Sequence, residues 1–337
     1  MLYQFVEKGY NIHKIMAKFN TSKLLEFLLK KYVVFAPVER ENELLFQRVY
    51  NPGEMSASLR LPKNSFKQFL LPHEEVLFDF TSPKVKKTIT PQVIFGLSLV
   101  DLKALILFDQ MFAKDPHYQA HRQNTLIVGQ CVVPEDAKFL SIFEENVLER
   151  LKFDILLDHR KKGEPKIFTG SRLGQKTLEK FGFNEYEHID FKGSIEGGVL
   201  DPKSQKLKEQ MKKVINDKKF WEEFAKDCIM CGKCTVACPT CYCFDLVDEG
   251  GEIGDDKAGV RKRRLSSCFY DDFASIAGGE NFLKTKAERL RNYYIHKFIR
   301  TPEREQILGC VGCLRCFQVC PVGIDIRKIL DAALKYK

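Results

Sequence analysis

The chain has 337 residues, of which 44% are hydrophobic and 29% are charged, and its formal net charge is +9 at pH 7. This length exceeds that of a small metal-stapled module and is sufficient for two domains. The most apolar stretch, VIFGLSLVDLKALILF, is interrupted by Asp101 and Lys103 and is too short to span a bilayer. Because the N-terminus carries charges early and has no apolar core typical of a secretory signal, we expect a soluble cytoplasmic protein.

Residues 1–202 are predicted to form a mixed α/β domain, because strand-like and helix-like segments alternate along them. Thr21 is a candidate N-cap for a helix over TSKLLEFLLKK, and the strand pattern of YVVF follows it and ends at Pro37. Further strands are expected in ENELLFQRV, PQVIFGL, NTLIVGQCVV, FDILLDH and EPKIFTG. Further helices are expected in VDLKALILFDQMF, EDAKFLSIFEENVLERL and SRLGQKTLEKFG, the last of which ends at Gly182. This order predicts a sheet flanked by helices.

Residues 203–337 are predicted to form a second, mostly helical domain that begins after Pro202. Apolar residues at helical spacing from Leu207 to Phe224 indicate an amphipathic helix that leads into Cys228. DEGGEIGDDKAG is predicted to be a loop, and YDDFASIA and FLKTKAERLRNYYIHKFI are predicted to be helical. No strand-like alternation is evident in this domain, so the expected fold class is α+β with a helical C-terminal part.

Cysteine usage distinguishes the second domain from the first. Of the twelve cysteines, eleven lie between Cys228 and Cys320, and Cys131 stands alone. The cytoplasm keeps thiols reduced, which argues against disulfides. The C-terminal third is therefore expected to have a chemistry of its own.

An internal repeat supplies that chemistry, because CIMCGKCTVACP and CVGCLRCFQVCP both follow the pattern C-x2-C-x2-C-x3-C-P. Three thiolates at this spacing fit three corners of a [4Fe-4S] cubane, and in two-cluster ferredoxins the fourth cysteine ligates the other cluster. Structural zinc is the alternative, but zinc sites use paired C-x2-C motifs. The 71 residues between the repeats favour an α-helical ferredoxin arrangement. Two [4Fe-4S] clusters are predicted, one ligated by Cys228, Cys231, Cys234 and Cys320 and the other by Cys310, Cys313, Cys316 and Cys238.

Three cysteines remain outside the repeat, namely Cys241, Cys243 and Cys268. One interpretation is that they are buried thiols that pack beside the clusters. A second is that they bind a third metal cluster together with another ligand such as Asp245. A third is that two of them form a redox-sensing pair.

The stretches CIMCGKCTVACPTCYCFD, ERLRNYYIHKF and CVGCLRCFQVCPVGIDI closely resemble a family of dicluster 4Fe-4S ferredoxin-like subunits, which is found in anaerobic sulfite reductases and, as the beta subunit, in sulfhydrogenases. FAPVE and LPKNSFKQFLLPHEEVLFDF extend the resemblance to the N-terminal part. The resemblance implies an electron carrier in a hetero-oligomer, beside a flavoprotein reductase-like subunit together with a separate catalytic metalloprotein subunit. That catalytic subunit would be a hydrogenase, a sulfite or sulfur reductase, or a heterodisulfide-reductase-like module.

The N-terminal part also departs from this family. Ser98-Leu99-Val100-Asp101 stands where the family usually has Arg-Pro-Cys-Asp, and VVPEDAKFLSIFEENV lacks the cysteines that the family normally has there. If those cysteines bind metal in the family, this chain has lost that site. Cys131 is then predicted to be a core thiol, and the N-terminal domain is predicted to be a docking scaffold.

The preferred function is electron transfer without catalysis by this chain. The alternative is a catalytic reductase subunit with its own substrate site in the N-terminal domain, although no Gly-rich nucleotide motif and no acid–base constellation is evident there. Redox sensing and nucleic-acid binding are a third hypothesis. The basic run Arg261–Arg264 is interpreted as a solvated face, for which an acidic protein partner is preferred to nucleic acid. Four scattered histidines are interpreted as structural, namely His73, His117, His121 and His159.

Overall fold

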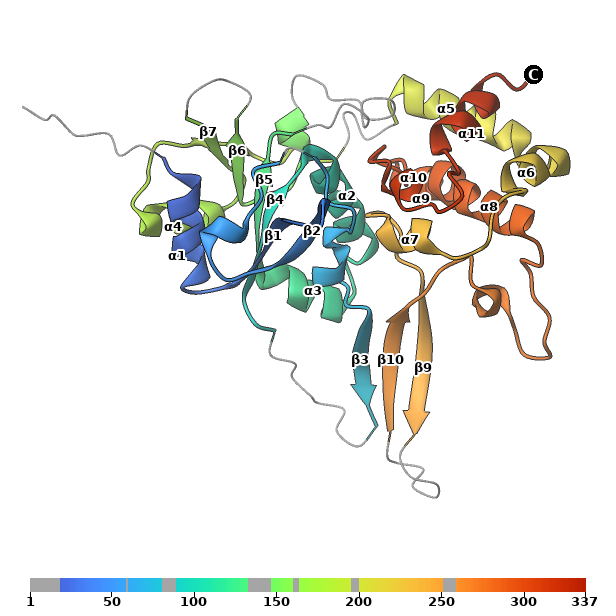
Figure 1. The fold of residues 1–337 in the computed structure, drawn as a ribbon, viewed down its shortest axis with the longest axis horizontal. Helices are drawn as coiled ribbons and strands as arrows, with labels where there is room; N and C mark the ends of the chain where they lie inside the picture. Colours follow the sequence, from blue (N-terminus) through green and yellow to red (C-terminus); the bar gives the residue numbers. More distant parts are fainter. Residues whose placement is uncertain are drawn as a thin grey trace, which may run out of the picture.

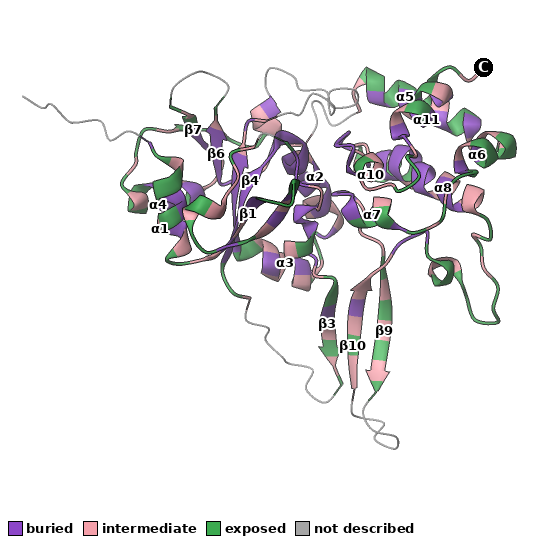
Figure 2. Cartoon of the chain, viewed as in Figure 1, coloured by how far each residue is buried: buried purple, intermediate pink, exposed green. Residues whose placement is uncertain are grey.

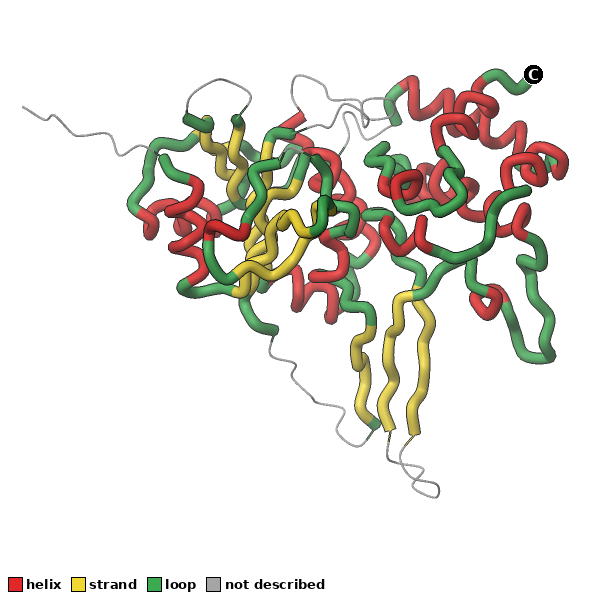
Figure 3. Tube along the Cα trace, viewed as in Figure 1, coloured by secondary structure: helices red, strands yellow, loops and turns green. Residues whose placement is uncertain are grey.

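A computed structural model describes residues 19–58, 60–80, 89–132, 147–159, 164–194, 200–250 and 259–337 (Figure 1). The fold class is α+β, as predicted. The N-terminal half contains a seven-stranded sheet with helices packed on it, and the C-terminal half is largely helical (Figure 3). A smaller three-stranded sheet combines strands from both halves.

The large sheet has the strand order β2-β1-β4-β5-β6-β7-β8. Strands β1, β4, β5 and β6 run parallel, β1 forms an antiparallel hairpin with β2, and β7 is antiparallel to β6 and parallel to β8. The six strands predicted in this half are present, with the bounds β1 (Val33–Arg40), β2 (Glu43–Val49), β4 (Gln92–Leu97), β5 (Thr125–Gln130), β6 (Ile155–Asp158) and β7 (Lys166–Thr169). The short strand β8 (Glu187–His188) was not predicted.

Helices cover both faces of this sheet. Side chains along a strand alternate between the two faces, so a strand that is apolar throughout, such as β4, gives both faces apolar side chains that must be buried. On one face, Val93 and Phe95 of β4 pack against α1 (Thr21–Leu29) and α4 (Arg172–Phe181). On the other face, Ile94 of β4 packs with α2 (Leu99–Met111) and α3 (Pro116–Gln123). Figure 2 shows this concentration of buried residues in β4 and α2.

Three local predictions in this half need correction or restriction. Asn20, not Thr21, caps α1, because its side chain accepts a hydrogen bond from the backbone of Lys23. Strand β1 does not end at Pro37 but continues to Arg40. Beyond Phe35 it pairs with β2 and no longer with β4, so its other edge has no strand partner there. Proline, which lacks a backbone N–H, is tolerated at such an edge. Of the helix predicted in EDAKFLSIFEENVLERL, residues 135–146 lie outside the described residues, and Val147–Arg150 form a 3-10 helix.

The C-terminal half packs its helices around a core that includes Trp221, Leu290, Phe298 and Leu330. The segment predicted from YDDFASIA forms only a short 3-10 helix, Asp271–Ala274. The last turn of α8 continues as a π-helix over His296–Arg300. The other helices are α5 (Pro202–Val214), α6 (Lys218–Ala225), α7 (Lys233–Ala237), α8 (Lys286–Ile295), α9 (Thr301–Glu305), α10 (Arg315–Gln318) and α11 (Ile326–Leu334). None of the described helices is both long and apolar enough to cross a membrane.

The prediction that no strand separates the two cysteine repeats was wrong. β9 (Phe244–Gly250) and β10 (Gly259–Leu265) form an antiparallel hairpin there, and β10 also pairs with β3 (Glu74–Asp79). The three strands project from the rest of the molecule in Figure 1. The sequences of β9 and β10 show little apolar alternation, because ion pairs between charged side chains on neighbouring strands, rather than a buried apolar face, stabilise this sheet. Lys262, for example, contacts Glu74 of β3 at 2.9 Å and Glu249 of β9 at 2.6 Å.

Buried ion pairs join the two halves of the molecule. Arg263 of β10 donates to Glu75 of β3 at 2.8 Å and to Asp115 at 2.6 Å, and Glu75 also contacts His121 at 2.9 Å. All four residues of the basic run Arg261–Arg264 are paired with carboxylates. Only Arg263 is buried, so the prediction of a solvated face is wrong for Arg263 and holds for the exposed Arg261.

Candidate metal centre

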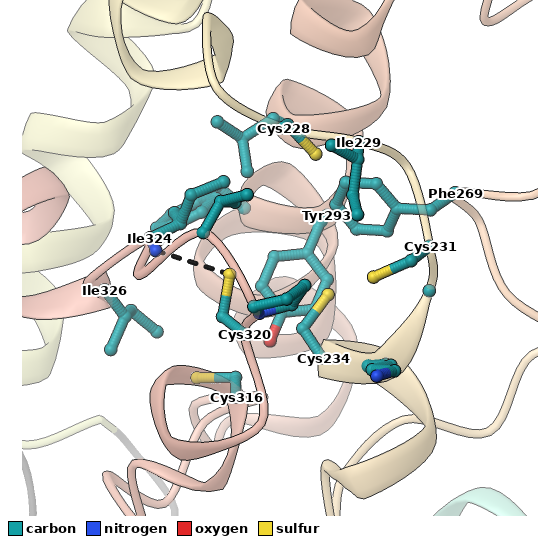
Figure 4. Close-up of a pocket in the computed structure, with 16 residues that line it drawn as sticks. Cys228, Ile229, Cys231, Cys234, Phe269, Tyr293, Cys316, Cys320, Ile324 and Ile326 are labelled. Carbon is teal, nitrogen blue, oxygen red and sulfur yellow. Dashed lines mark hydrogen bonds between the residues drawn. The ribbon is translucent and has the colours of Figure 1, made fainter.

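The first group of thiols surrounds a common cavity. Cys228, Cys231 and Cys234 come from the first repeat, and Cys320 comes from the end of the second. Figure 4 shows these four sulfurs around one space, with the side chain of Cys316 beside it. Much of the remaining wall is apolar and includes Ile229, Phe269, Tyr293, Ile324 and Ile326. The structure therefore places the four residues of the first predicted set together.

The backbone around this cavity is shaped to approach the sulfurs closely. The N–H of Met230 donates to Cys228 Sγ at 3.5 Å, and the N–H of Ile324 donates to Cys320 Sγ at 3.3 Å (Figure 4 draws the second bond). Gly232 has a φ of +71°, and a Cβ there would lie 2.5 Å from the ring of Tyr270. Only glycine satisfies both the backbone angle and the close approach.

The second group consists of Cys238, Cys310, Cys313 and Cys316. Burial, followed by the charges of Cys313, Cys310 and Cys238, raises the pKa of Cys316 well above its usual value. Burial also raises the pKa of Cys310 to about 12, with Cys238 among its neighbours. Cys238 is thus near Cys310 and Cys316 of the second repeat, and it is also among the charged neighbours of Cys234 of the first. Because Cys316 also lines the first cavity, the two groups are adjacent.

Lys297 in the π-helix provides a positive charge beside the second group. Its Nζ donates to Cys238 Sγ at 3.2 Å, to Thr240 Oγ1 at 2.9 Å and to the carbonyl of Gly309 at 2.8 Å. Burial tends to lower the pKa of Lys297, but the charges of Cys238, Cys241 and Cys310 outweigh it and raise the pKa. Since metal ligands must be deprotonated, a buried ammonium group compensates the thiolate charge.

Lys67 reaches the same region from the N-terminal half. It lies in the 3-10 helix Phe66–Phe69, and its buried Nζ donates to the carbonyls of Thr235 at 2.8 Å and Cys241 at 3.0 Å. Burial lowers the pKa of Lys67, although Cys241 and Cys238 oppose that shift. Thiols, backbone N–H donors and the Lys297 ammonium group together form a donor set that fits an anionic, thiolate-ligated group.

The three remaining cysteines have different thiol neighbours. A hydrogen bond between the side chains of Cys241 and Cys238 raises the pKa of Cys241 and lowers that of Cys238. A hydrogen bond with Cys268, partly opposed by burial, lowers the pKa of Cys243 to about 7. Asp245 lies opposite Arg264 in the β9–β10 ladder. Within the described ranges, no group of three or more His, Cys, Asp or Glu side chains is placed as the ligands of a single metal ion.

Comparison with known proteins decides the class of this region. Residues 227–324, which contain both repeats, match the family described as the 4Fe-4S dicluster domain. This segment is a 4Fe-4S dicluster domain.

A relative extends the comparison beyond the dicluster domain. The chain is 28% identical over 312 residues to sulfhydrogenase 2 subunit beta of Pyrococcus furiosus, an alignment that covers 88% of this chain and 91% of the relative. The predicted resemblance is thereby confirmed, and so is the predicted iron–sulfur class. No solved structure matches the chain.

The N-terminal half contacts the dicluster domain through the segment that departs from the family pattern. Ser98 caps α2 and donates to Asp101 at 2.9 Å, and Asp101 in turn accepts two bonds from Arg315, at 2.6 and 3.1 Å. Arg315 lies between two cysteines of the second repeat and also donates to the carbonyl of Pro62. Val311 and Cys313 pack in the same core as α2. Sequence reasoning singled out residues 98–101 but not their partner.

Two of the other residues named from the sequence of the N-terminal half have structural surroundings, whereas His73 and His159 are exposed. Cys131 is buried in the core with α2. His121 is buried and paired with Glu75. Sequence reasoning missed Lys67 and Lys297 altogether. The position of Lys297 in the apolar run YYIHKFI was a usable signal, because a lysine that is buried requires partners.

Proposed function

We propose that this chain is a non-catalytic electron-transfer subunit that holds two [4Fe-4S] clusters. Cys228, Cys231, Cys234 and Cys320 would hold the first cluster, and the second would be held by Cys238, Cys310, Cys313 and Cys316. The observation that supports the proposal most strongly is that Cys320 of the second repeat lines one cavity with Cys228, Cys231 and Cys234 of the first. The corresponding place of Cys238 in the second set is part of the proposal. When bound, the clusters supply one-electron transfer.

The residues around the thiols would keep water out and adjust the cluster potentials. Apolar side chains line the first cavity, backbone N–H groups donate to Cys228 and Cys320, and Lys297 donates to Cys238. Burial and hydrogen bonds to sulfur are two of the means by which proteins set cluster potentials. The dicluster domain therefore has the surroundings that an electron relay needs.

We further propose that the chain works in a cytoplasmic hetero-oligomer. The relative's name makes it the beta subunit of a sulfhydrogenase, which supports a place within a multi-subunit redox complex. Two partners are proposed, a flavoprotein reductase-like subunit together with a catalytic metalloprotein subunit. Native purification followed by mass spectrometry should recover both; recovery of the chain alone would contradict this part.

Metal content tests the cluster proposal. Protein purified without oxygen should contain about eight irons per chain, and dithionite should bleach its visible absorption. About twelve irons would instead indicate a third cluster at Cys241, Cys243 and Cys268. Zinc without iron would overturn the proposal. Reduction of NAD(P)+ or sulfite by the isolated chain would support the alternative of a catalytic subunit with an N-terminal substrate site.

A further inference from the structure

A second cavity, of about 620 Å³, shares no residue with the cavity of the first thiol group. It lies between the loop around Asp271–Ala274 and the end of α8, and the π-helix and α9 complete its wall. Its volume is within the range of small-molecule sites in proteins. None of the eight repeat cysteines lines it, so electron transfer between the clusters does not account for it.

The polar wall of this cavity is cationic. Arg291, Arg300 and Arg304 line it together with His296, and no carboxylate is among the described residues that line it. Burial, and after it the charges of Lys297, Arg300 and Arg304, lower the pKa of His296 to about 4. A positive cavity without its own acidic residues favours an anionic ligand, and guanidinium groups suit planar or tetrahedral oxyanions.

Two of these arginines have unused hydrogen-bonding capacity. The Nε of Arg291 is buried and has no hydrogen-bond partner among the described residues. Arg300 is exposed, and its side chain makes no hydrogen bond or ion pair with a described residue. Arg304, by contrast, is held by Tyr242 at 3.0 Å and by Glu305 at 2.7 Å. Arg291 also donates from Nη1 to the carbonyl of Ile215 at 3.5 Å. The guanidinium group of Arg300 is therefore the one most available to an anionic group in the cavity.

The other walls restrict the kind of anion. Phe273 and Phe282 come from the loop on one side, and Ile295 comes from α8 on the other. Cys243 and Cys268 also line the cavity, and Cys234 of the first thiol group is among the charged neighbours of Cys268. A ligand in this cavity would therefore need an apolar part. Only the side chain of Cys268 would separate it from Cys234 of the first thiol group.

We propose that this cavity binds a small organic oxyanion, a molecule with a phosphate, carboxylate or sulfonate group attached to an apolar body. The oxyanion would bind to Arg291 and Arg300, and the apolar body would pack on Phe273 and Phe282.

Calorimetric titration of the iron-loaded full chain, without oxygen and at fixed salt, tests this site. The probe is phenyl phosphate, with inorganic phosphate and phenol as probes of its two parts. Phenyl phosphate should bind with a Kd below about 1 mM, and each part alone should bind at least about tenfold more weakly. Arg291→Gln and Arg300→Gln should each weaken phenyl phosphate binding about tenfold, which corresponds to one charge-assisted hydrogen bond.

Arg172→Gln on α4 is the matched control, because it removes the same charge far from the cavity. It should leave the Kd unchanged. Arg300→Gln remains informative if Arg291→Gln folds poorly, since Arg300 supports no described contact. The proposal is overturned if phenyl phosphate gives no heat, if inorganic phosphate binds as tightly as phenyl phosphate, or if Arg172→Gln weakens binding as much as Arg300→Gln does.

Discussion

At the scale of single residues, Lys297 is the side chain with the most direct influence on the proposed second cluster. Its ammonium group donates to Cys238 Sγ and has two further acceptors, so its position is fixed. A positive charge beside a cluster ligand stabilises the more negative, reduced state. The π-helix at His296–Arg300 places this lysine, and such turns are frequent at functional sites.

Lys297→Met should therefore lower the reduction potential of one cluster and leave the other nearly unchanged. The expected fall is on the order of 60 mV, which for one electron is a tenfold change in the equilibrium. A redox titration followed by EPR measures it. Lys180→Met, on the exposed side of α4, is the control of equal charge, and an equal shift in that variant would contradict the role given to Lys297.

Position 232 requires glycine for two reasons, its positive φ and the close packing of neighbouring side chains. Gly232→Ala should lower stability by more than the roughly 1–2 kcal/mol of a left-handed alanine, because its Cβ would meet Tyr270 and Ser267. Gly278 has a φ of +92° and open space around it, so Gly278→Ala should show the backbone cost alone. Thermal unfolding and iron content compare the two variants. Equal losses would mean that close approach at Gly232 is unimportant.

At the scale of secondary-structure elements, the sequence predicted those whose stability comes from local apolar patterns. Every residue of β4 is buried, and its run of Val, Ile, Phe and Leu was recognisable. The β9–β10 hairpin was missed because no residue of β9 is buried and its charges pair across strands. Glu74 and Lys262 are 188 residues apart, so a single sequence does not reveal that their strands are neighbours.

The buried ion pair at the centre of the three-stranded sheet should contribute far more to stability than the exposed ion pair at its edge. Arg263→Met leaves Glu75 buried without its guanidinium partner and should lower the free energy of unfolding by about 3–5 kcal/mol. Arg261→Met, two residues away on the same strand, removes the exposed pair with Asp248 and should lower the free energy of unfolding far less, because solvent screens that pair. Urea unfolding measures both. Similar losses in the two variants would show that burial of Arg263 contributes little.

At the scale of the whole molecule, the N-terminal half supports the dicluster domain directly. Asp101 holds Arg315 between two cysteines of the second repeat, and Lys67 donates to the carbonyl of Cys241. The two cysteine repeats and their iron–sulfur class could be predicted because the spacing within each repeat is local and specific. The support from Asp101 and Lys67 could not, since it depends on how distant segments pack.

Asp101→Asn should destabilise the chain by about 3–5 kcal/mol, because Arg315 would remain buried without a charged partner. The second cluster, held near Arg315, should be lost before the first, so the iron content should fall from about eight towards about four. Glu43→Gln, which removes the exposed pair with Lys63, is the control. Equal loss of both clusters would contradict a specific link between Asp101 and the second repeat.

The exchange of Cys238 and Cys320 between the repeats is the central claim, and EPR of single-cysteine variants tests it most directly. Reduced protein from Cys238→Ala, Cys313→Ala, Cys320→Ala and Cys231→Ala would be compared signal by signal. Cys238→Ala should lose the same cluster signal as Cys313→Ala, and Cys320→Ala the same signal as Cys231→Ala. If Cys238→Ala instead loses the signal that Cys231→Ala loses, each repeat binds its own cluster and the crossed assignment is wrong.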